Sequence, residues 1–148
     1  MSGATIPRKG LITAIIALLA MIGPFTIDMV YPGFAAMGAE LMASPTAMQQ
    51  VTSVYLLSFA VMSLWHGPVS DAVGRKPVMI TGMVAYSLAS AVCALAPSLE
   101  ILLLGRALQG LSAGAAQIIS RTVIRDLFRG AAAQRMMANV SMIFGLAP

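Results

Sequence analysis

Residues 99–119 read LEILLLGRALQGLSAGAAQII, an apolar run with one arginine, Arg106, well inside it. A membrane-spanning α-helix needs about 20 largely apolar residues to cross a hydrocarbon core of about 30 Å. The run has that length, and Pro97-Ser98 before it is typical of a tight turn. It therefore predicts a helix that crosses a bilayer.

Runs of the same character lie on both sides of this one. Three precede it, and the second of them is entered through Ser44-Pro45-Thr46, where a helix start is natural. The first is longer than the apolar core of about 7–15 residues in a signal peptide, so we expect it to remain as a span. The sequence thus predicts an all-α, polytopic membrane helix bundle with four spans and part of a fifth. The expected spans are residues 11–31, 48–66, 78–96, 99–119 and 133–148.

The composition agrees with a bilayer environment and argues against several other classes of protein. Charged residues make up 9% of the 148 residues, against about 25% in soluble domains, and hydrophobic residues make up 59%. A soluble fold of this length could not bury so much apolar surface. The net charge of +4 does not indicate nucleic-acid binding, because the basic residues lie between the apolar runs. The single cysteine, Cys93, cannot form a metal site alone and no catalytic motif is evident, so we expect neither an enzyme nor a cofactor.

The Lys and Arg residues predict the orientation of the chain. All nine except Arg106 fall on one side of the expected spans, whereas the opposite loops contain Glu40 and Glu100. Positive residues gather on the cytoplasmic side of membrane proteins. We therefore expect residues 1–10 to lie in the cytoplasm, as the N-terminus of a multi-pass protein of the inner membrane. The basic residues on this side are Arg8, Lys9, Arg75, Lys76, Arg121, Arg125, Arg129 and Arg135.

Two ionisable residues of opposite sign, Asp28 and Arg106, lie inside the expected spans. Either one costs about 2.5–3.5 kcal/mol at the centre of a membrane helix, so each is a candidate functional residue. The arrangement suggests proton coupling, in which Arg106 tunes a protonatable carboxylate or grips a substrate. The two could pair if the first span is long or tilted; alternatively, Asp28 is a hydrated residue at a helix end. Tyr55 and Gln109 are candidate residues of a substrate cavity.

Residues 67–77 read GPVSDAVGRKP and form the densest motif in the chain. A plain loop on the positive side of the membrane explains the two basic residues but not the regular spacing. The two glycines permit backbone conformations that other residues resist. The aspartate lies four residues before the arginine, so the two could pair if this turn is helical. The motif residues are Gly67, Asp71, Gly74, Arg75 and Lys76.

This spacing resembles the signature loop of the major facilitator superfamily, commonly written G-x-L-x-D-R-x-G-R-K/R. The sequence departs from that pattern at Val69, where leucine is usual, and at Ala72, where a basic residue is usual. Residues 102–110 (LLLGRALQG) resemble the fourth-helix signature of proton-coupled drug exporters in this superfamily. Two shorter stretches, residues 27–32 (IDMVYP) and 125–128 (RDLF), are similar to the bicyclomycin and chloramphenicol resistance (Bcr/CflA) type.

The resemblance implies a specific fold and activity. Such transporters have twelve helices in two six-helix halves, so residues 11–148 would form part of the N-terminal half and would need the missing C-terminal helices as partners. They export small amphipathic drugs in exchange for protons by alternating access, which confers antibiotic resistance. The acid matching Asp28 takes part in coupling, and the arginine matching Arg106 lies beside the central cavity. The charge network that closes the cytoplasmic side is formed by the residues matching Asp71, Arg75 and Asp126.

Two other interpretations stay open. The chain could belong to a metabolite or sugar porter of the same superfamily, although the stretches around Asp28 and Asp126 favour a drug exporter. It could also be a truncated membrane fragment that does not transport, since four spans and part of a fifth cannot form a two-halved transporter alone.

Overall fold

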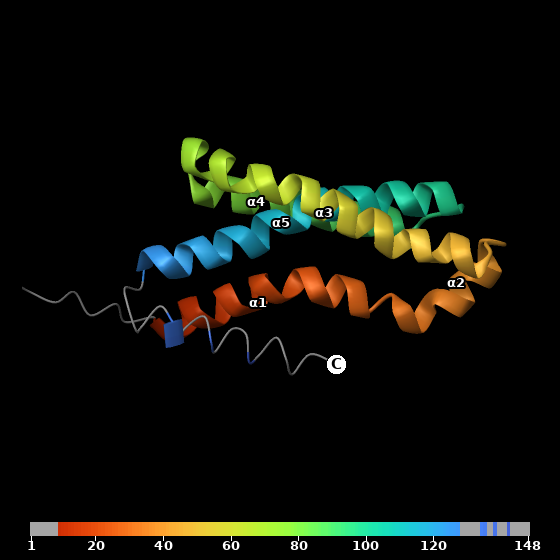
Figure 1. The fold of residues 1–148 in the computed structure, drawn as a ribbon, viewed down its shortest axis with the longest axis horizontal. Coiled ribbons are helices and arrows are strands. Elements are labelled where there is room, and N and C mark those ends of the chain that lie inside the picture. The colour runs from red at the N-terminus through yellow and green to blue at the C-terminus, as the bar shows by residue number, and fades with distance from the viewer. Residues whose placement is uncertain (1–8, 128–133, 136–137, 139–141, 143–148) are drawn as a thin grey trace, which may run out of the picture.

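The structure is a computed structural model that describes residues 9–127, 134, 135, 138 and 142. These residues form helices and no strand, which confirms the predicted all-α fold (Figure 1). The elements are α1 (Lys9–Asp28), the short 3-10 helix η1 (Tyr31–Gly33), α2 (Phe34–Glu40), α3 (Pro45–Val73), α4 (Arg75–Ala94) and α5 (Leu99–Leu127).

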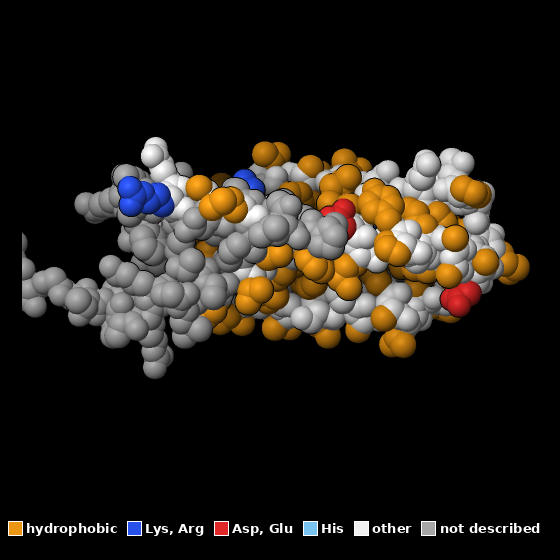
Figure 2. All heavy atoms as spheres, turned by 90° about the horizontal axis from the view of Figure 1, so that it is seen from below, with side chains coloured by type: hydrophobic (Ala, Val, Ile, Leu, Met, Phe, Trp, Pro, Cys, Tyr) orange, Lys and Arg blue, Asp and Glu red, His pale blue; other side chains and the backbone are white. Residues whose placement is uncertain are grey.

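Four stretches of these helices are long and apolar enough to cross a membrane, as predicted. Figure 2 shows hydrophobic side chains over much of the described surface, with the visible Lys and Arg side chains toward one end. The expected fifth span lies largely outside the described residues. The four stretches are Leu18–Glu40, Pro45–Val73, Arg75–Ala94 and Leu99–Ile124.

The start of α3 is fixed by a helix cap. Ser44 has an extended backbone, and its hydroxyl oxygen accepts a hydrogen bond from the backbone N–H of Ala47 at 3.2 Å. Pro45 follows as the first helical residue, where the absence of an N–H leaves no helical hydrogen bond unmade. This signal was readable in the sequence, and the structure confirms it.

Residues 67–77 are mostly helix, whereas the sequence suggested a loop. α3 continues to Val73, and Pro68 lies inside it. A proline in a helix removes the backbone hydrogen bond to the carbonyl four residues earlier, here that of Leu64, and membrane helices tolerate such a loss. Ser70 donates its hydroxyl hydrogen to a different carbonyl oxygen, that of Gly67, at 2.8 Å. The motif therefore extends the second membrane helix instead of ending it.

The break between α3 and α4 is confined to Gly74. Its φ of 94° lies in the region that side chains disfavour, which confirms the special conformation expected of this glycine. Gly67 has an ordinary helical backbone, so the same expectation for Gly67 is wrong. Because Arg75 begins α4 at once, a single residue connects two membrane helices.

α5 is the central helix of the bundle. It packs against α3, α4 and α1 (Figure 1). Glycines permit the closest approaches: a Cβ on Gly110 would lie 2.4 Å from the carbonyl oxygen of Tyr55, and one on Gly105 would lie 2.6 Å from the sulfur of Cys93. Small residues are typical where membrane helices pack closely. The buried apolar residues of α5 are Leu102, Ala113, Ala115, Ala116, Ile119 and Ile124.

Gly110→Ala should therefore lower the thermal stability of the bundle. The added methyl group must displace α3, because its nearest neighbour is backbone and not a flexible side chain. Overpacking of this kind costs about 1–3 kcal/mol, which a thermal unfolding scan in detergent would detect. Gly38→Ala in α2 is the matched control, since the nearest atoms to its Cβ position lie at 3.4 Å and 3.5 Å, an ordinary contact, and alanine is the better helix former. Equal unfolding midpoints for the two variants would contradict the close contact of α3 with α5.

Candidate functional site

Arg106 is buried among α1, α3 and α5, with 3% of its surface exposed. Its guanidinium donates from Nε to the carbonyl oxygen of Val51 at 3.4 Å, from Nη1 to Oε1 of Gln109 at 2.9 Å, and from Nη2 to the carbonyl oxygen of Thr26 at 3.2 Å. The ring of Tyr55 faces it, with 5.1 Å between Cζ and the ring centroid. One side chain therefore joins three helices.

The partners of Arg106 are neutral. Within the described residues no ion pair involves this side chain. Arginine stays protonated in proteins, so its charge is compensated by oxygen dipoles and by the ring of Tyr55, a contact that contributes about 2 kcal/mol when desolvated. A buried charge without such partners would cost several kcal/mol. The arrangement makes Arg106 a permanent cation held in place at the centre of the bundle.

Further hydroxyl groups extend this cluster to α4. Gln109 donates from Nε2 to the hydroxyl oxygen of Ser90 at 2.8 Å. The hydroxyl groups of Thr26 and Tyr86 share a short hydrogen bond between α1 and α4. Sequence reasoning missed these three hydroxyl residues. Tyr86 and Ser90 are four residues apart and share one helix face, which was the available signal.

Tyr55 and Gln109, the two predicted cavity residues, both lie beside Arg106. They are buried, with 1% and 5% of their surfaces exposed. Tyr55 donates its hydroxyl hydrogen to the carbonyl oxygen of Gly23 at 3.1 Å, which ties α3 to α1. In this structure they act as partners of the buried cation, and their contact with a substrate stays a prediction.

Asp28 is the last residue of α1 and its side chain is exposed. No ion pair joins it to Arg106 in the described part of the chain, so the suggested pairing is absent. The reason is geometric: Arg106 bonds to the carbonyl of Thr26, and Asp28 comes two residues later, about 200° further around the helix. Asp28 lines a cavity of about 690 Å³ together with Phe25, Met29, Tyr31 and Pro32.

The ion pair expected in the motif at residues 67–77 is present. Nη2 of Arg75 donates to Oδ1 of Asp71 at 3.4 Å, across the break between α3 and α4. The side chains are 28% and 66% exposed, so the pair contributes about 1 kcal/mol or less. Lys76 is exposed beside them, and the side chain of Asp126, in the last turn of α5, lies outside what the structure describes. Nowhere among the described residues do histidine, cysteine and acidic side chains form a cluster that could hold a metal ion.

Proteins with similar sequences include one named as a transporter and others named for multidrug resistance. The family model of the Major Facilitator Superfamily matches residues 14–148. An uncharacterized MFS-type transporter of Bacillus subtilis, YdgK, is 34% identical over 134 residues, which is 90% of this chain and 33% of that protein. In Escherichia coli, multidrug resistance protein D is 36% identical over 113 residues (76% of this chain, 29% of that protein), and multidrug resistance protein MdtL is 39% identical over 108 residues (73% and 28%). The chain thus spans about a third of the length of these relatives.

Arg106→Lys tests whether the shape of the guanidinium matters as well as its charge. A lysine ammonium is a single point on a flexible stem, so it cannot reach acceptors on three helices together. We expect a loss of about 2 kcal/mol or more, since a hydrogen bond from a charged group contributes about 1.5–3 kcal/mol. Arg121→Lys, at an exposed arginine of the same helix, is the control. If both variants unfold at the wild-type temperature, the three contacts do not stabilise the bundle.

Proposed function

Because the chain belongs to the major facilitator superfamily, we propose that it is part of a transporter that exports small amphipathic drugs across the inner membrane in exchange for protons. Family membership indicates a transporter rather than an enzyme. The relatives named for multidrug resistance support a drug as the cargo. Since the chain spans about a third of such relatives, we assign the activity to a longer protein in which C-terminal helices complete the transport path.

The proposal rests on one observation: among the described residues, the buried guanidinium of Arg106 and the carboxylate of Asp28 form no ion pair with each other. Arg106 is buried and held by neutral partners, whereas Asp28 faces a cavity and makes no ion pair among the described residues. A guanidinium does not release its proton in proteins, but a carboxylate does. We therefore assign the transported proton to Asp28. Arg106 acts as a positioning residue, because its bond to the carbonyl of Thr26 fixes the end of α1.

The lining of the Asp28 cavity supports an amphipathic cargo. Phe25 and Tyr31 contribute aromatic rings, and Met29 contributes a flexible thioether that adapts to varied apolar shapes. The ionised carboxylate attracts a positively charged or polar group on the drug, and protonation removes that attraction. Drug and proton therefore compete for Asp28, which is the requirement for exchange. Tyr55 and Gln109 would meet the cargo when the helices around Arg106 separate.

We assign the cytoplasmic gate to the motif that connects α3 and α4. Gly74 alone links the two helices, so a change at this residue can alter the angle between them. The ion pair across the break is exposed and weak, so it can open and close during transport. The excess of Lys and Arg on this side supports a cytoplasmic N-terminus. The gate residues are Gly67, Asp71, Gly74, Arg75, Lys76 and Asp126.

Asp28→Asn should abolish proton-driven efflux. Asparagine keeps the size of the side chain but cannot take up or release the proton. Drug accumulation in a host that lacks its own efflux pumps, expressing the full-length gene product, measures this. Glu40→Gln is the matched control, because Glu40 is also an exposed carboxylate, at the end of α2. Wild-type efflux by Asp28→Asn would rule out Asp28 as the coupling acid.

Asp71→Asn should reduce efflux while leaving the stability of the protein almost unchanged. The lost ion pair is exposed, so the free energy of unfolding should change by about 1 kcal/mol or less, while efflux should fall severalfold. Thermal unfolding of the purified protein and the same accumulation assay provide the two readouts. A large drop in stability, or unchanged efflux, would show that the pair is not a gate.

A further inference from the structure

Thr26, in the last turn of α1, is held by two other helices at two different atoms. Its carbonyl oxygen accepts a hydrogen bond from Nη2 of Arg106 on α5 at 3.2 Å. Its hydroxyl group shares a hydrogen bond with the hydroxyl group of Tyr86 on α4. Thr26 is 7% exposed, so both bonds lie inside the bundle. Asp28 follows two residues later, directly after this double contact.

The donor in the bond between the two hydroxyl groups is Tyr86. Oγ1 of Thr26 lies 2.5 Å from the carbonyl oxygen of Ile22. A carbonyl oxygen carries no hydrogen, so Thr26 must donate to it. Because a threonine hydroxyl has only one hydrogen, Thr26 accepts from Tyr86. Phenylalanine in place of Tyr86 would therefore remove this donor while keeping the ring.

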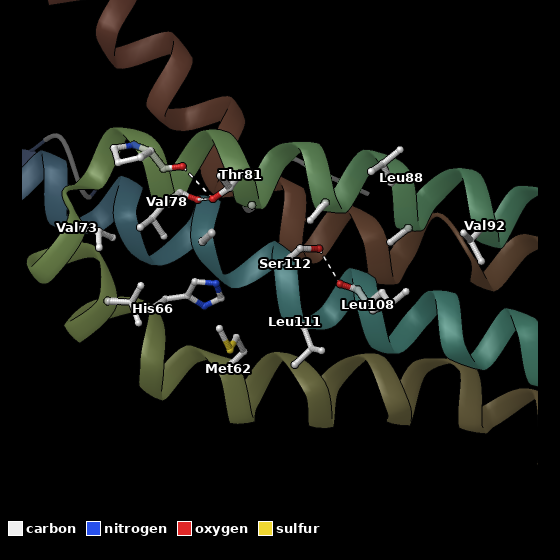
Figure 3. Close-up of a pocket in the computed structure, with 16 residues that line it drawn as sticks. Met62, His66, Val73, Val78, Thr81, Leu88, Val92, Leu108, Leu111 and Ser112 are labelled. Atoms are coloured by element: carbon white, nitrogen blue, oxygen red, sulfur yellow. Dashed lines mark hydrogen bonds between the residues drawn. The ribbon is translucent and has the colours of Figure 1, made fainter.

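Tyr86 extends from a helix that is firmly packed. Figure 3 shows α4 beside α5, along the groove that these two helices form with α3. The two helices approach closely before and after Tyr86. A Cβ on Gly82 would lie 2.4 Å from Cβ of Ala115, and one on Gly105 would lie 2.6 Å from the sulfur of Cys93. The packing of α4 on α5 therefore sets the position of Tyr86 independently of α1.

The space between α1 and α4 is loosely filled around this bond. A cavity of about 360 Å³ lies there, lined by side chains from the range 18–29 and, on α4, by Tyr86 alone. The backbone of α1 packs closely against α5. In the described part of the chain, the bond between Thr26 and Tyr86 is the hydrogen bond that joins α1 to α4. Loss of this bond would give α1 room to turn.

The other polar contacts between α1 and the bundle come from α3 and α5 in the described part of the chain. Tyr55 donates to the carbonyl oxygen of Gly23, and Arg106 donates to that of Thr26. The two carbonyls are three residues apart, so they share one face of the helix. Contacts on one face allow a helix to turn about them, whereas a further contact from α4 fixes its rotation. Since Asp28 lies about 200° from Thr26 around the helix, this rotation directs its carboxylate away from the guanidinium.

We propose that Tyr86 is a positioning residue that keeps the carboxylate of Asp28 apart from the guanidinium of Arg106. The inference rests on the proposed function, because it takes Asp28 as the group that binds the proton. Opposite charges attract, so α1 turns toward Arg106 when the bond to α4 is lost. A cation beside a carboxylate favours its ionised form and occupies the oxygen atoms that a cationic drug needs. Tyr86 thus keeps Asp28 available to both drug and proton.

Few titratable groups in the described part of the chain surround Asp28. One other titratable side chain, Tyr31 of η1, lines its cavity. On the opposite side of α1 lie Arg106 of α5, Tyr55 of α3 and Tyr86 of α4. Of these groups Arg106 alone is charged at neutral pH. A change in the pH dependence of drug binding therefore reports the approach of Arg106 to Asp28.

The binding of tetraphenylphosphonium to the purified full-length gene product, measured from acid to neutral pH, tests the inference. This probe is an apolar cation without titratable groups, so its pH dependence comes from the protein. We expect the wild type to lose the probe on acidification, as a proton replaces the cation on Asp28. In Tyr86→Phe the affinity at neutral pH should fall severalfold. The pH at which half of the binding is lost should move down by about one unit.

Changes at Thr26 test the same bond from its other side. Thr26→Val removes the acceptor but keeps the carbonyl that Arg106 binds, so it should give the same shift. Combined with Tyr86→Phe, it should shift the midpoint no further, because both changes remove one bond. Thr26→Ser, the conservative variant, keeps the hydroxyl group and should restore the wild-type midpoint. Ser87→Ala is the matched control, since this exposed hydroxyl group bonds only within α4.

A wild-type midpoint in Tyr86→Phe and Thr26→Val would overturn the inference. So would a midpoint at higher pH, or a loss of affinity that is equal at every pH, which would leave Tyr86 as a packing residue. Asp28→Asn separates this result from a failure of the proposed function. If Asp28→Asn binds the probe with the affinity and pH dependence of the wild type, Asp28 is not the proton site and the proposed function fails first.

Discussion

The guanidinium of Arg106 has to be satisfied inside an apolar helix bundle, and the arrangement of the other helices depends on how this is done. A buried charge without partners would cost several kcal/mol, and here the partners come from α1, α3 and α5 itself. The acceptor on α1 and the acceptor on α3 are backbone carbonyls, so Arg106 holds the positions of helices and not only of side chains. Glycines in α5 allow the close approach that these contacts require, as at Gly110.

The charged side chains differ in how firmly their partners hold them, and the buried one is held more firmly than the exposed ones. Arg106 is buried and fixed, so it organises the bundle but does not exchange a proton. Asp28 is exposed in a cavity and unpaired among the described residues, and it is the carboxylate to which we assign the transported proton. Asp71 and Arg75 form an exposed pair that is weak enough to break. The proposed exchange of drug and proton rests on this difference between a fixed charge, an unpaired one and a weakly paired one.

Much of this organisation could be predicted from sequence. The four spans follow from hydropathy, Arg106 is conspicuous as a charge within an apolar run, and Asp71 and Arg75 have helical spacing. Other features depend on tertiary packing. Thr26 meets Tyr86 across 60 residues of sequence, and the relative rotation of α1 and α5 decides that the carbonyl of Thr26 faces Arg106. Local signals also misled at residues 67–68, because Gly-Pro suggests a turn whereas the membrane helix continues through it.

The central claim, that neutral backbone acceptors hold the buried cation, can be observed directly. A cryo-electron microscopy map of the full-length protein in a lipid nanodisc would show the guanidinium of Arg106 and its neighbours. The account predicts that Nη2 lies within hydrogen-bond distance of the Thr26 carbonyl and Nε within that of the Val51 carbonyl, with the carboxylate of Asp28 turned away. Density that joins the guanidinium to the carboxylate of Asp28 and leaves both carbonyls without this donor would contradict it.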